Sequence, residues 1–215
     1  MYRYVLFDLD GTLTDSGPGI MWAAQSALHD MGIEENSTAE LRKFVGPPLA
    51  DSFRDRYGLE GADCDKAVAL YRDYYNHHGG VYQNAVYPGI PELLARLRDL
   101  DRTLIIATSK SDWATRTVLA HFGLDRYFSI IAVADDILRR TKTDVIRYAV
   151  GQAGICDLSE AVMVGDRYHD ITAAKELGID SIGVLFGYGS RHELEESGAD
   201  YIAETVEEIG SIILA

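Results

Sequence analysis

Cysteine is scarce in this chain of 215 residues, which contains only Cys64 and Cys156. The two lie far apart, and neither belongs to a Cys-x-x-Cys or a mixed cysteine and histidine spacing. The sequence therefore indicates neither a disulfide framework nor a zinc site. We expect both cysteines to be reduced structural thiols.

Basic residues are also in short supply, because 20 Lys and Arg stand against 34 Asp and Glu, for a formal net charge of −14. Binding to a nucleic acid polymer needs a basic face, so we do not expect such a partner. A small phosphorylated molecule is compatible with this composition. A few lysines, backbone N–H groups and a metal ion can hold one anion inside an acidic protein.

Long hydrophobic runs are missing too, since none approaches the roughly 18 residues of a membrane-spanning helix. No basic segment followed by an apolar one opens the chain. We therefore expect a cytoplasmic protein without a membrane partner.

What the sequence does contain is a repeated pattern of short apolar runs. The first is residues 4–9, and four more follow a long helical region at 103–108, 128–134, 161–166 and 181–186. Single segments of helical period separate these later runs. Strands that are apolar throughout and alternate with helices are typical of parallel βαβ units covered on both faces. The pattern predicts an α/β fold with a doubly wound parallel sheet.

Between the first two runs the period is helical, which predicts an α-helical bundle inserted after the first strand. We expect a core domain of residues 1–14 and 84–215 and an inserted helical domain of residues 15–83. Tyr71, Tyr74 and Tyr75 form a stripe in this insert that could be a ligand cage or helix packing. We interpret the stripe as packing, because its spacing is that of one helix face.

Polar residues gather where the predicted strands end, in segments far apart in the sequence. At the strand ends they are Asp8, Asp10, Thr108, Ser109, Lys110 and Asp166; Asp170 follows four residues after Asp166, and Lys142 stands at the start of the helix before that strand. Ligands of open parallel sheets bind outside the carboxyl ends of the strands. Clustered carboxylates are costly to bury unless they are neutralised, and Mg²⁺ fits best because it combines one or two carboxylates with water and a substrate phosphate.

Each of these residues also has a structural alternative. Asp8 or Asp10 could cap a turn, Thr108 could simply end a strand, Lys142 could be solvated at a helix start, and Asp170 could be the N-cap of a helix over residues 171–177.

Taken together, the set suits phosphoryl transfer. A carboxylate beside Mg²⁺ can attack phosphorus and form an aspartyl phosphate, and a second carboxylate two residues along can serve as general acid and base. Lys142, Thr108 and the neighbouring Ser109 are the predicted phosphate-binding side chains. Gly11 would let the backbone approach the phosphate closely.

The segments DLDGT, ATSK and GDRYHD, with the isolated Lys142, together resemble the haloacid dehalogenase superfamily in its phosphatase form. The chain looks most like the phosphoglycolate phosphatase-like and 5′-nucleotidase-like branch, over nearly its whole length and including a helical cap. The resemblance implies Asp8 as nucleophile and Asp10 as general acid and base, with Thr108 and Lys142 as phosphate binders. It also implies Mg²⁺ bound by Asp8, the backbone carbonyl of Asp10 and Asp166, with Asp170 as a further carboxylate of the metal site.

Two neighbouring activities fit less well. Dehalogenases of the superfamily lack a second aspartate two residues after the nucleophile, so Asp10 argues against that chemistry. The β-phosphoglucomutase relatives carry a histidine and a basic residue in the cap where this chain has Ile20 and Leu49. A β-phosphoglucomutase-like phosphotransferase stays as an alternative. A non-catalytic phospho-acceptor module is a further one, but it leaves residues 15–83 unexplained.

We predict a Mg²⁺-dependent phosphomonoesterase for a small phosphorylated metabolite. Phosphoglycolate, a nucleoside monophosphate and a sugar phosphate all remain open. Lys43, Gly46 and Pro47 in the segment RKFVGPPL are predicted to contact the substrate, although Gly-Pro-Pro could simply break a helix. Arg167 is predicted to reach an anionic substrate.

Overall fold

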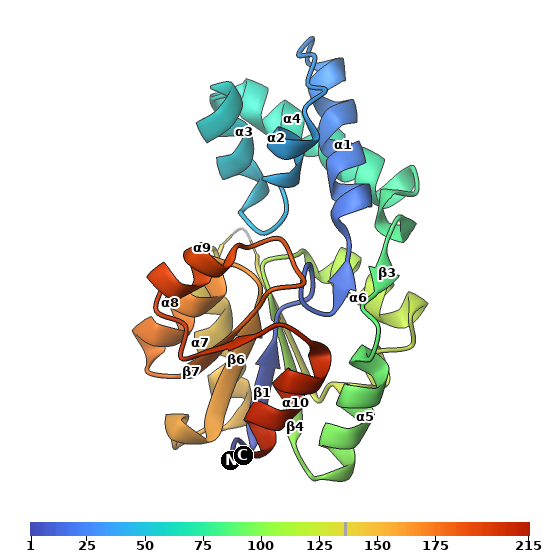
Figure 1. Ribbon diagram of the computed structural model, residues 1–215. Coiled ribbons are helices and arrows are strands. Elements are labelled where there is room, and N and C mark those ends of the chain that lie inside the picture. Colours follow the sequence, from blue (N-terminus) through green and yellow to red (C-terminus); the bar gives the residue numbers. More distant parts are fainter. Residues whose placement is uncertain (136) are drawn as a thin grey trace. The chain divides into compact units, whose positions relative to one another are not determined.

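The computed structural model describes residues 1–135 and 137–215. Its core is a six-stranded sheet in which every neighbouring pair of strands is parallel (Figure 1). In spatial order the strands are β5 (Ile130–Val133), β4 (Thr103–Thr108), β1 (Tyr4–Phe7), β6 (Ala161–Gly165), β7 (Asp180–Val184) and β8 (Tyr201–Ala203).

Strand β1 lies inside this sheet, between β4 and β6. The chain builds the sheet from β1 outward to β5 and then crosses to β6 on the other side of β1. Val5, Leu6 and Phe7 have no exposed surface, which explains why β1 is apolar on both faces. Ligand sites of doubly wound sheets lie where the strand order reverses, so the carboxyl end of β1 is the expected place.

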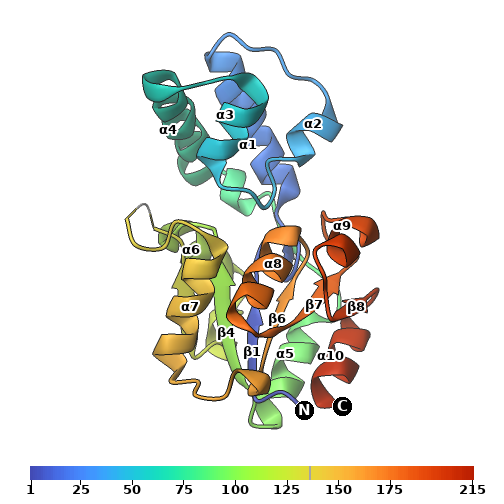
Figure 2. The ribbon, with the colours of Figure 1, turned by 90° about the vertical axis from the view of Figure 1, so that its left-hand side faces the viewer.

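Helices cover both faces of the sheet (Figure 2). On one face α7 (Lys142–Ala153) and α8 (Tyr168–Leu177) pack on the strands and on each other, around Leu6, Ile105 and Met163. On the other face α5 (Ile90–Asp99) contacts β4 and also packs against α10 (Val206–Leu214). The predicted doubly wound sheet is confirmed. The shorter helical segments of the core are α6 (Asp112–His121), η2 (Asp125–Tyr127), η3 (Leu158–Glu160) and α9 (Arg191–Glu196).

Two helix starts matter for the site. Thr141 is the N-cap of α7, where its hydroxyl accepts a hydrogen bond from Asp144 N and its own N–H donates to Asp144 Oδ2. Helix α8 begins at Tyr168, so the alternative in which Asp170 caps a helix over residues 171–177 is wrong. Asp170 instead lies in the first turn, where its Oδ2 accepts a hydrogen bond from Arg167 N.

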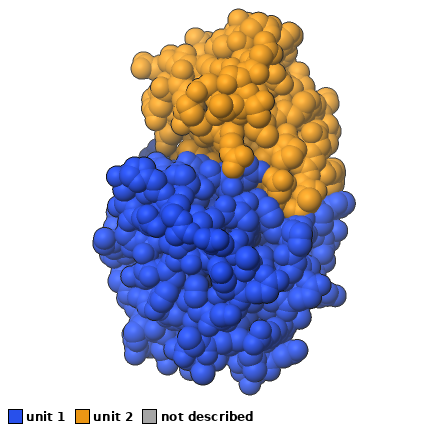
Figure 3. All heavy atoms as spheres, in the orientation of Figure 1, with its two compact units in different colours: residues 1–14, 86–215 blue, residues 15–85 orange. Residues whose placement is uncertain are grey.

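The contacts within the chain divide it into two compact units, residues 1–14 with 86–215 and residues 15–85 (Figure 3). The sequence analysis placed the second boundary after residue 83. The chain passes between the units in the two-stranded sheet of β2 (Thr14–Asp15) and β3 (Ala85–Val86).

The second unit is helical. Its longest helices, α1 and α4, pack side by side, and α3 packs on α4. Tyr75 is buried and stacks on Tyr71, while Tyr74 meets Trp22 edge to face. The tyrosine stripe therefore contributes to helix packing. The helical segments of this unit are α1 (Gly17–Asp30), α2 (Thr38–Arg42), α3 (Leu49–Tyr57), α4 (Gly61–His77) and η1 (Gly80–Tyr82). Over the described residues, none of the helices is both long and apolar enough to cross a membrane.

Candidate active site

Strand register brings the predicted site residues to one edge of the sheet. Phe7 is level with Ile106 of β4 and with Val164 of β6, and Asp8 N donates to Val164 O over 2.9 Å. The polar residues that follow these three strands therefore come out at similar heights. Asp8 follows β1, Thr108 ends β4, and Asp166 follows β6.

Three carboxylates lie together at this edge. Each of Asp8, Asp166 and Asp170 offers one oxygen, and these oxygens lie within 4.8 Å of one another. All three side chains are buried. Asp166 Oδ1 accepts no hydrogen bond from the described residues, so a buried acceptor is left for another partner.

Lys142 partly compensates this negative charge. Its Nζ lies 2.9 Å from Asp8 Oδ1 and 2.7 Å from Asp170 Oδ1, in ion-pair contact. Burial by itself would lower the pKa of Lys142, but the charges of Asp170 and Asp8 raise it overall, so the side chain stays an ammonium.

One ammonium does not balance three carboxylates. Burial, together with the charges of Asp170 and Asp8, raises the pKa of Asp166 well above its ordinary value. Burial also raises the pKa of Asp170, against the opposing effect of Lys142. A buried carboxylate oxygen without a donor, in a cluster with excess negative charge, matches the needs of a hard divalent cation, so these residues fit a metal site.

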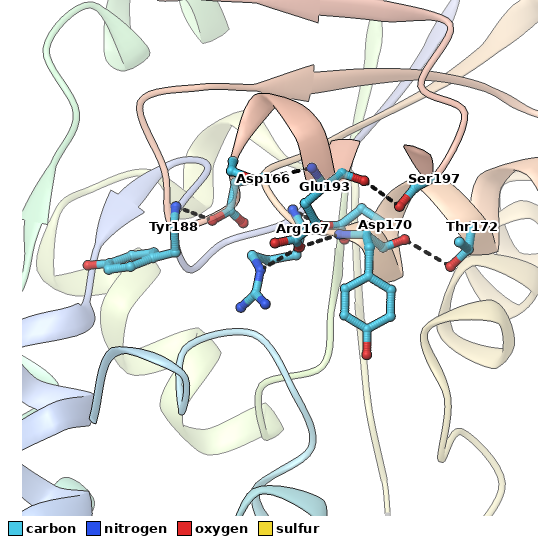
Figure 4. A network of polar contacts seen from close by, with 9 residues as sticks. Asp166, Arg167, Asp170, Thr172, Tyr188, Glu193 and Ser197 are labelled. Carbon is cyan, nitrogen blue, oxygen red and sulfur yellow. Dashed lines mark hydrogen bonds and ion pairs between the residues drawn. The ribbon is translucent and has the colours of Figure 1, made fainter. Parts of the chain in front are cut away.

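The segment between β7 and α9 contacts Asp166, and Figure 4 shows this contact at Tyr188. Tyr188 N donates to Asp166 Oδ2 over 2.7 Å. A Cβ on Gly187 would lie 2.4 Å from Asp166 Cβ, and one on Gly189 would lie 2.0 Å from Asp166 O. Side chains at these two positions would therefore displace Asp166. The sequence analysis missed this segment, although its two glycines just after a strand are a signal of close backbone approach.

Gly11 is also a point of close approach. Its φ is +81°, and a Cβ there would lie 2.1 Å from Asp166 Oδ2. Gly11 N donates to Thr14 O over 2.7 Å, which holds the turn after β1. The glycine is therefore required both by the backbone conformation and by the neighbouring carboxylate.

The carboxylate of Asp10 pairs with a different lysine from the carboxylate of Asp8. Lys110 Nζ lies 3.1 Å from Asp10 Oδ1 and 3.0 Å from Asp10 Oδ2. The carboxylate of Asp10 is not part of the cluster of Asp8, Asp166 and Asp170. Lys110 belongs to the segment ATSK, but the sequence analysis gave it no role.

Thr108 and Ser109 stand beside this pair. Thr108 is buried, and its Oγ1 accepts a hydrogen bond of 3.3 Å from Lys110 N. Ser109 is half-buried in the turn after β4. Both residues lie at the carboxyl edge of the sheet, where the resemblance puts a phosphate-binding hydroxyl.

Arg167 is held by a residue that the sequence analysis missed. Its Nε donates to Glu193 Oε1 over 2.8 Å (Figure 4). Tyr168 N donates to the same oxygen over 3.0 Å. Glu193 lies in α9, a short helix that the periodicity did not reveal. His169 lies in the first turn of α8 and is half-buried. Burial, together with the charges of Arg167 and Lys142, lowers the pKa of His169 to about 4.

The model of the haloacid dehalogenase-like hydrolase family matches residues 5–184, which include every motif of this site. The chain belongs to this family.

Several curated relatives of this chain can be compared with it. A 5′-nucleotidase of Pseudomonas aeruginosa is 41% identical over 194 residues, which cover 90% of this chain and 87% of the relative. A tyrosine-protein kinase PtkA of Mycobacterium tuberculosis is 38% identical, covering 96% of this chain and 71% of the relative. A phosphoglycolate phosphatase of Neisseria meningitidis is 33% identical, covering 95% of this chain and 91% of the relative.

A solved structure of a predicted phosphatase from Clostridium acetobutylicum superimposes on the whole fold. It has a TM-score of 0.94 at 42% sequence identity and covers 100% of this chain and 99% of its own. The prediction of a haloacid dehalogenase-type phosphatase is therefore confirmed at the level of the family.

In the helical unit, the residues predicted to contact the substrate all lie in the segment between α2 and α3. Lys43 follows α2 and is exposed, with its Nζ paired to Glu40 Oε1. Gly46 adopts a φ of +108°, and Pro47 is half-buried just before α3. The positive φ shows that the glycine is needed for the turn between α2 and α3, as the helix-break alternative expects.

Proposed function

We propose that this phosphatase hydrolyses monoesters of small phosphorylated metabolites, using Mg²⁺ and a covalent intermediate on Asp8. The observation that supports this most is the buried triplet of Asp8, Asp166 and Asp170, whose oxygens lie within 4.8 Å of one another at the switch point of the sheet. A magnesium ion would be held by Asp8, Asp166 and the backbone carbonyl of Asp10, with Asp170 close by. When bound, it supplies the positive charge that the carboxylates and the phosphate of the substrate share.

Asp8 is the proposed nucleophile. Its carboxylate oxygen attacks phosphorus as the ester P–O bond breaks, which leaves the phosphoryl group on Asp8 and releases the alcohol. Lys142, 2.9 Å from Asp8 Oδ1, is placed to balance negative charge on the phosphoryl oxygens. The Thr108 and Ser109 hydroxyls and the backbone N–H groups that follow Asp8 are proposed to orient those oxygens.

Asp10 is the proposed general acid and base. In its acid form it gives its proton to the leaving oxygen, and as a carboxylate it then takes a proton from water. The resulting hydroxide attacks phosphorus, the bond to Asp8 breaks, and inorganic phosphate leaves with Asp8 restored. Asp10 suits this role because its side chain stands apart from the triplet, in a separate pairing with Lys110.

The test compares wild type with Asp8→Asn on p-nitrophenyl phosphate, in Mg²⁺ and in excess EDTA. Removing the nucleophile or the metal should each lower kcat by about a hundredfold or more. Asp125→Asn, at an exposed acidic residue on the core, is the matched control and should keep full activity. Full turnover of Asp8→Asn, or of wild type in EDTA, would contradict the proposal.

The substrate class can be tested with a panel of phosphorylated metabolites. The names of two relatives suggest nucleoside monophosphates and phosphoglycolate, and sugar phosphates complete the set. We propose that Lys43, Gly46, Pro47 and Arg167 help to select among them. Values of kcat/KM with phosphate release measure hydrolysis, and product analysis detects transfer to a second hydroxyl, as the mutase alternative requires. Because one relative is named a tyrosine-protein kinase, the panel includes ATP with a tyrosine-containing protein. Transfer without phosphate release would contradict a hydrolase.

A further inference from the structure

The ion pair of Lys110 and Asp10 joins two segments of the site that are 100 residues apart in the sequence. Nζ of Lys110 lies at 3.1 and 3.0 Å from the two carboxylate oxygens of Asp10, so that one ammonium contacts both. The side chains are 7% and 13% exposed. Lysine is rarely buried to this degree without a charged partner, so the contact is a built feature of the fold rather than a chance surface pair.

Both partners are held at the backbone. Lys110 N donates to Thr108 Oγ1 over 3.3 Å, which fixes the turn after β4. On the other side, Asp10 forms a parallel β-bridge with Thr14, and Gly11 N donates to Thr14 O over 2.7 Å. Lys110 contacts both oxygens of Asp10 and so limits the directions that this carboxylate can take.

The two lysines of the site contact different carboxylates. Lys142 contacts Asp8 and Asp170, whereas Lys110 contacts Asp10. Asp8, the proposed nucleophile, and Asp10, the proposed general acid and base, are thus paired with different lysines.

We propose that Lys110 is the positioning residue for Asp10, which it orients for proton transfer and whose charge it stabilises. This inference rests on the proposed function, because it concerns the acid and base step of that mechanism. As Asp10 passes its proton to the leaving oxygen, negative charge develops on its carboxylate next to the Lys110 ammonium. Lys110 itself neither gains nor loses a proton, and the carboxylate is held in place until water returns a proton to Asp10. A preorganised charge of this kind lowers the barrier without reorganisation during the reaction.

The experiment is a leaving-group series. An alkyl phosphate such as glycerol phosphate has a poor leaving group that needs a proton, whereas p-nitrophenolate leaves without one. Lys110→Met should lower kcat on the alkyl ester by about tenfold or more and on the aryl ester by only about threefold or less, with KM little changed. Asp10→Asn should show the same selectivity in stronger form. Adding Lys110→Met to Asp10→Asn should change nothing further.

Three further variants sharpen the test. Lys110→Arg keeps the positive charge and should recover part of the alkyl phosphatase activity. Lys175→Met removes an exposed lysine of α8 and should leave both esters unaffected. Lys110→Gln goes through the same series if the methionine variant does not fold.

Equal losses on both esters, or a raised KM, would overturn the inference, because Lys110 would then bind the phosphate itself. A lowered melting temperature with unchanged selectivity would overturn it in favour of a structural role. If Asp10→Asn itself lacked leaving-group selectivity, the proposed role of Asp10 would fail first, and the two failures are thereby distinguished.

Discussion

Gly11 shows how closely the backbone and a carboxylate approach each other at this site. A Cβ at this position would lie 2.1 Å from Asp166 Oδ2, and the φ of +81° is itself unfavourable for any other residue. Two separate effects of a substitution can therefore be expected, one on the conformation of the turn and one on the carboxylate cluster.

Gly11→Ala should suffer both effects. The positive φ should destabilise the fold by about 1–2 kcal/mol, and displacement of Asp166 should lower kcat by at least about tenfold. Gly123→Ala is the matched control, because its φ is +64° but a Cβ there meets nothing within 4 Å. Denaturant unfolding and phosphatase assays of the two variants separate strain from displacement. Equal activities in both would show that the predicted clash is relieved without harm to the site.

Some site residues were predictable from their side chains and others were not. Asp8 and Asp166 stood out because charged residues at the ends of apolar runs are unusual, and Lys142 and Asp170 stood out only as members of the same set. Tyr188 contributes only its backbone N–H to Asp166, which any residue other than proline could supply, so its identity gave no signal. The pairing of Lys110 with Asp10 depends on where two separate turns lead, which spacing in the sequence does not specify.

Among the elements, α7 combines a strong local signal with a place in the site. Its N-cap Thr141 comes directly before Lys142, the first residue of the helix. A loss of the cap therefore affects the residue that faces Asp8 and Asp170 as well as the helix itself.

Thr141→Ala should destabilise the protein by about 1 kcal/mol and also reduce kcat, because the first turn that holds Lys142 becomes less ordered. Thr205→Ala is the control. Thr205 caps α10 in the same way, by accepting a hydrogen bond from Glu208 N. Helix α10, however, packs on α5 and on the edge strand β8, and it supplies none of the site residues. We expect a similar loss of stability there with unchanged kcat. The two ΔG values come from urea unfolding, and a normal kcat in Thr141→Ala would contradict the coupling.

The strands were easier to predict than the small helices. Residues 103–108 form β4 as expected, because the continuous apolar run inside this segment is buried on both faces of the sheet. Helix α9 has six residues and a single buried one, Leu194, so it carries no readable period. It nevertheless supplies Glu193, which holds Arg167.

At the scale of the whole molecule, charge is the dominant feature. A formal net charge of −14 means that acidic groups repel one another across the surface. Salt screens such repulsion over about 8–10 Å at 0.1–0.15 M. The melting temperature, measured in EDTA by scanning calorimetry, should therefore rise between 10 and about 200 mM NaCl. The same rise in KCl would show that screening is responsible, and a fall in both salts would mean that attractive pairs outweigh the repulsion.

The central place of β1 has a consequence for synthesis of the protein. Asp8 is made first, but the neighbours that complete its surroundings come from β6 and from the segment around Tyr188, much later in the chain. A nascent or truncated polypeptide that ends before residue 160 therefore carries the proposed nucleophile with two of the clustered acids missing. Chains that end before residue 160 should be inert toward phosphate esters, and activity should begin only once β6, the start of α8 and the segment around Tyr188 have been made.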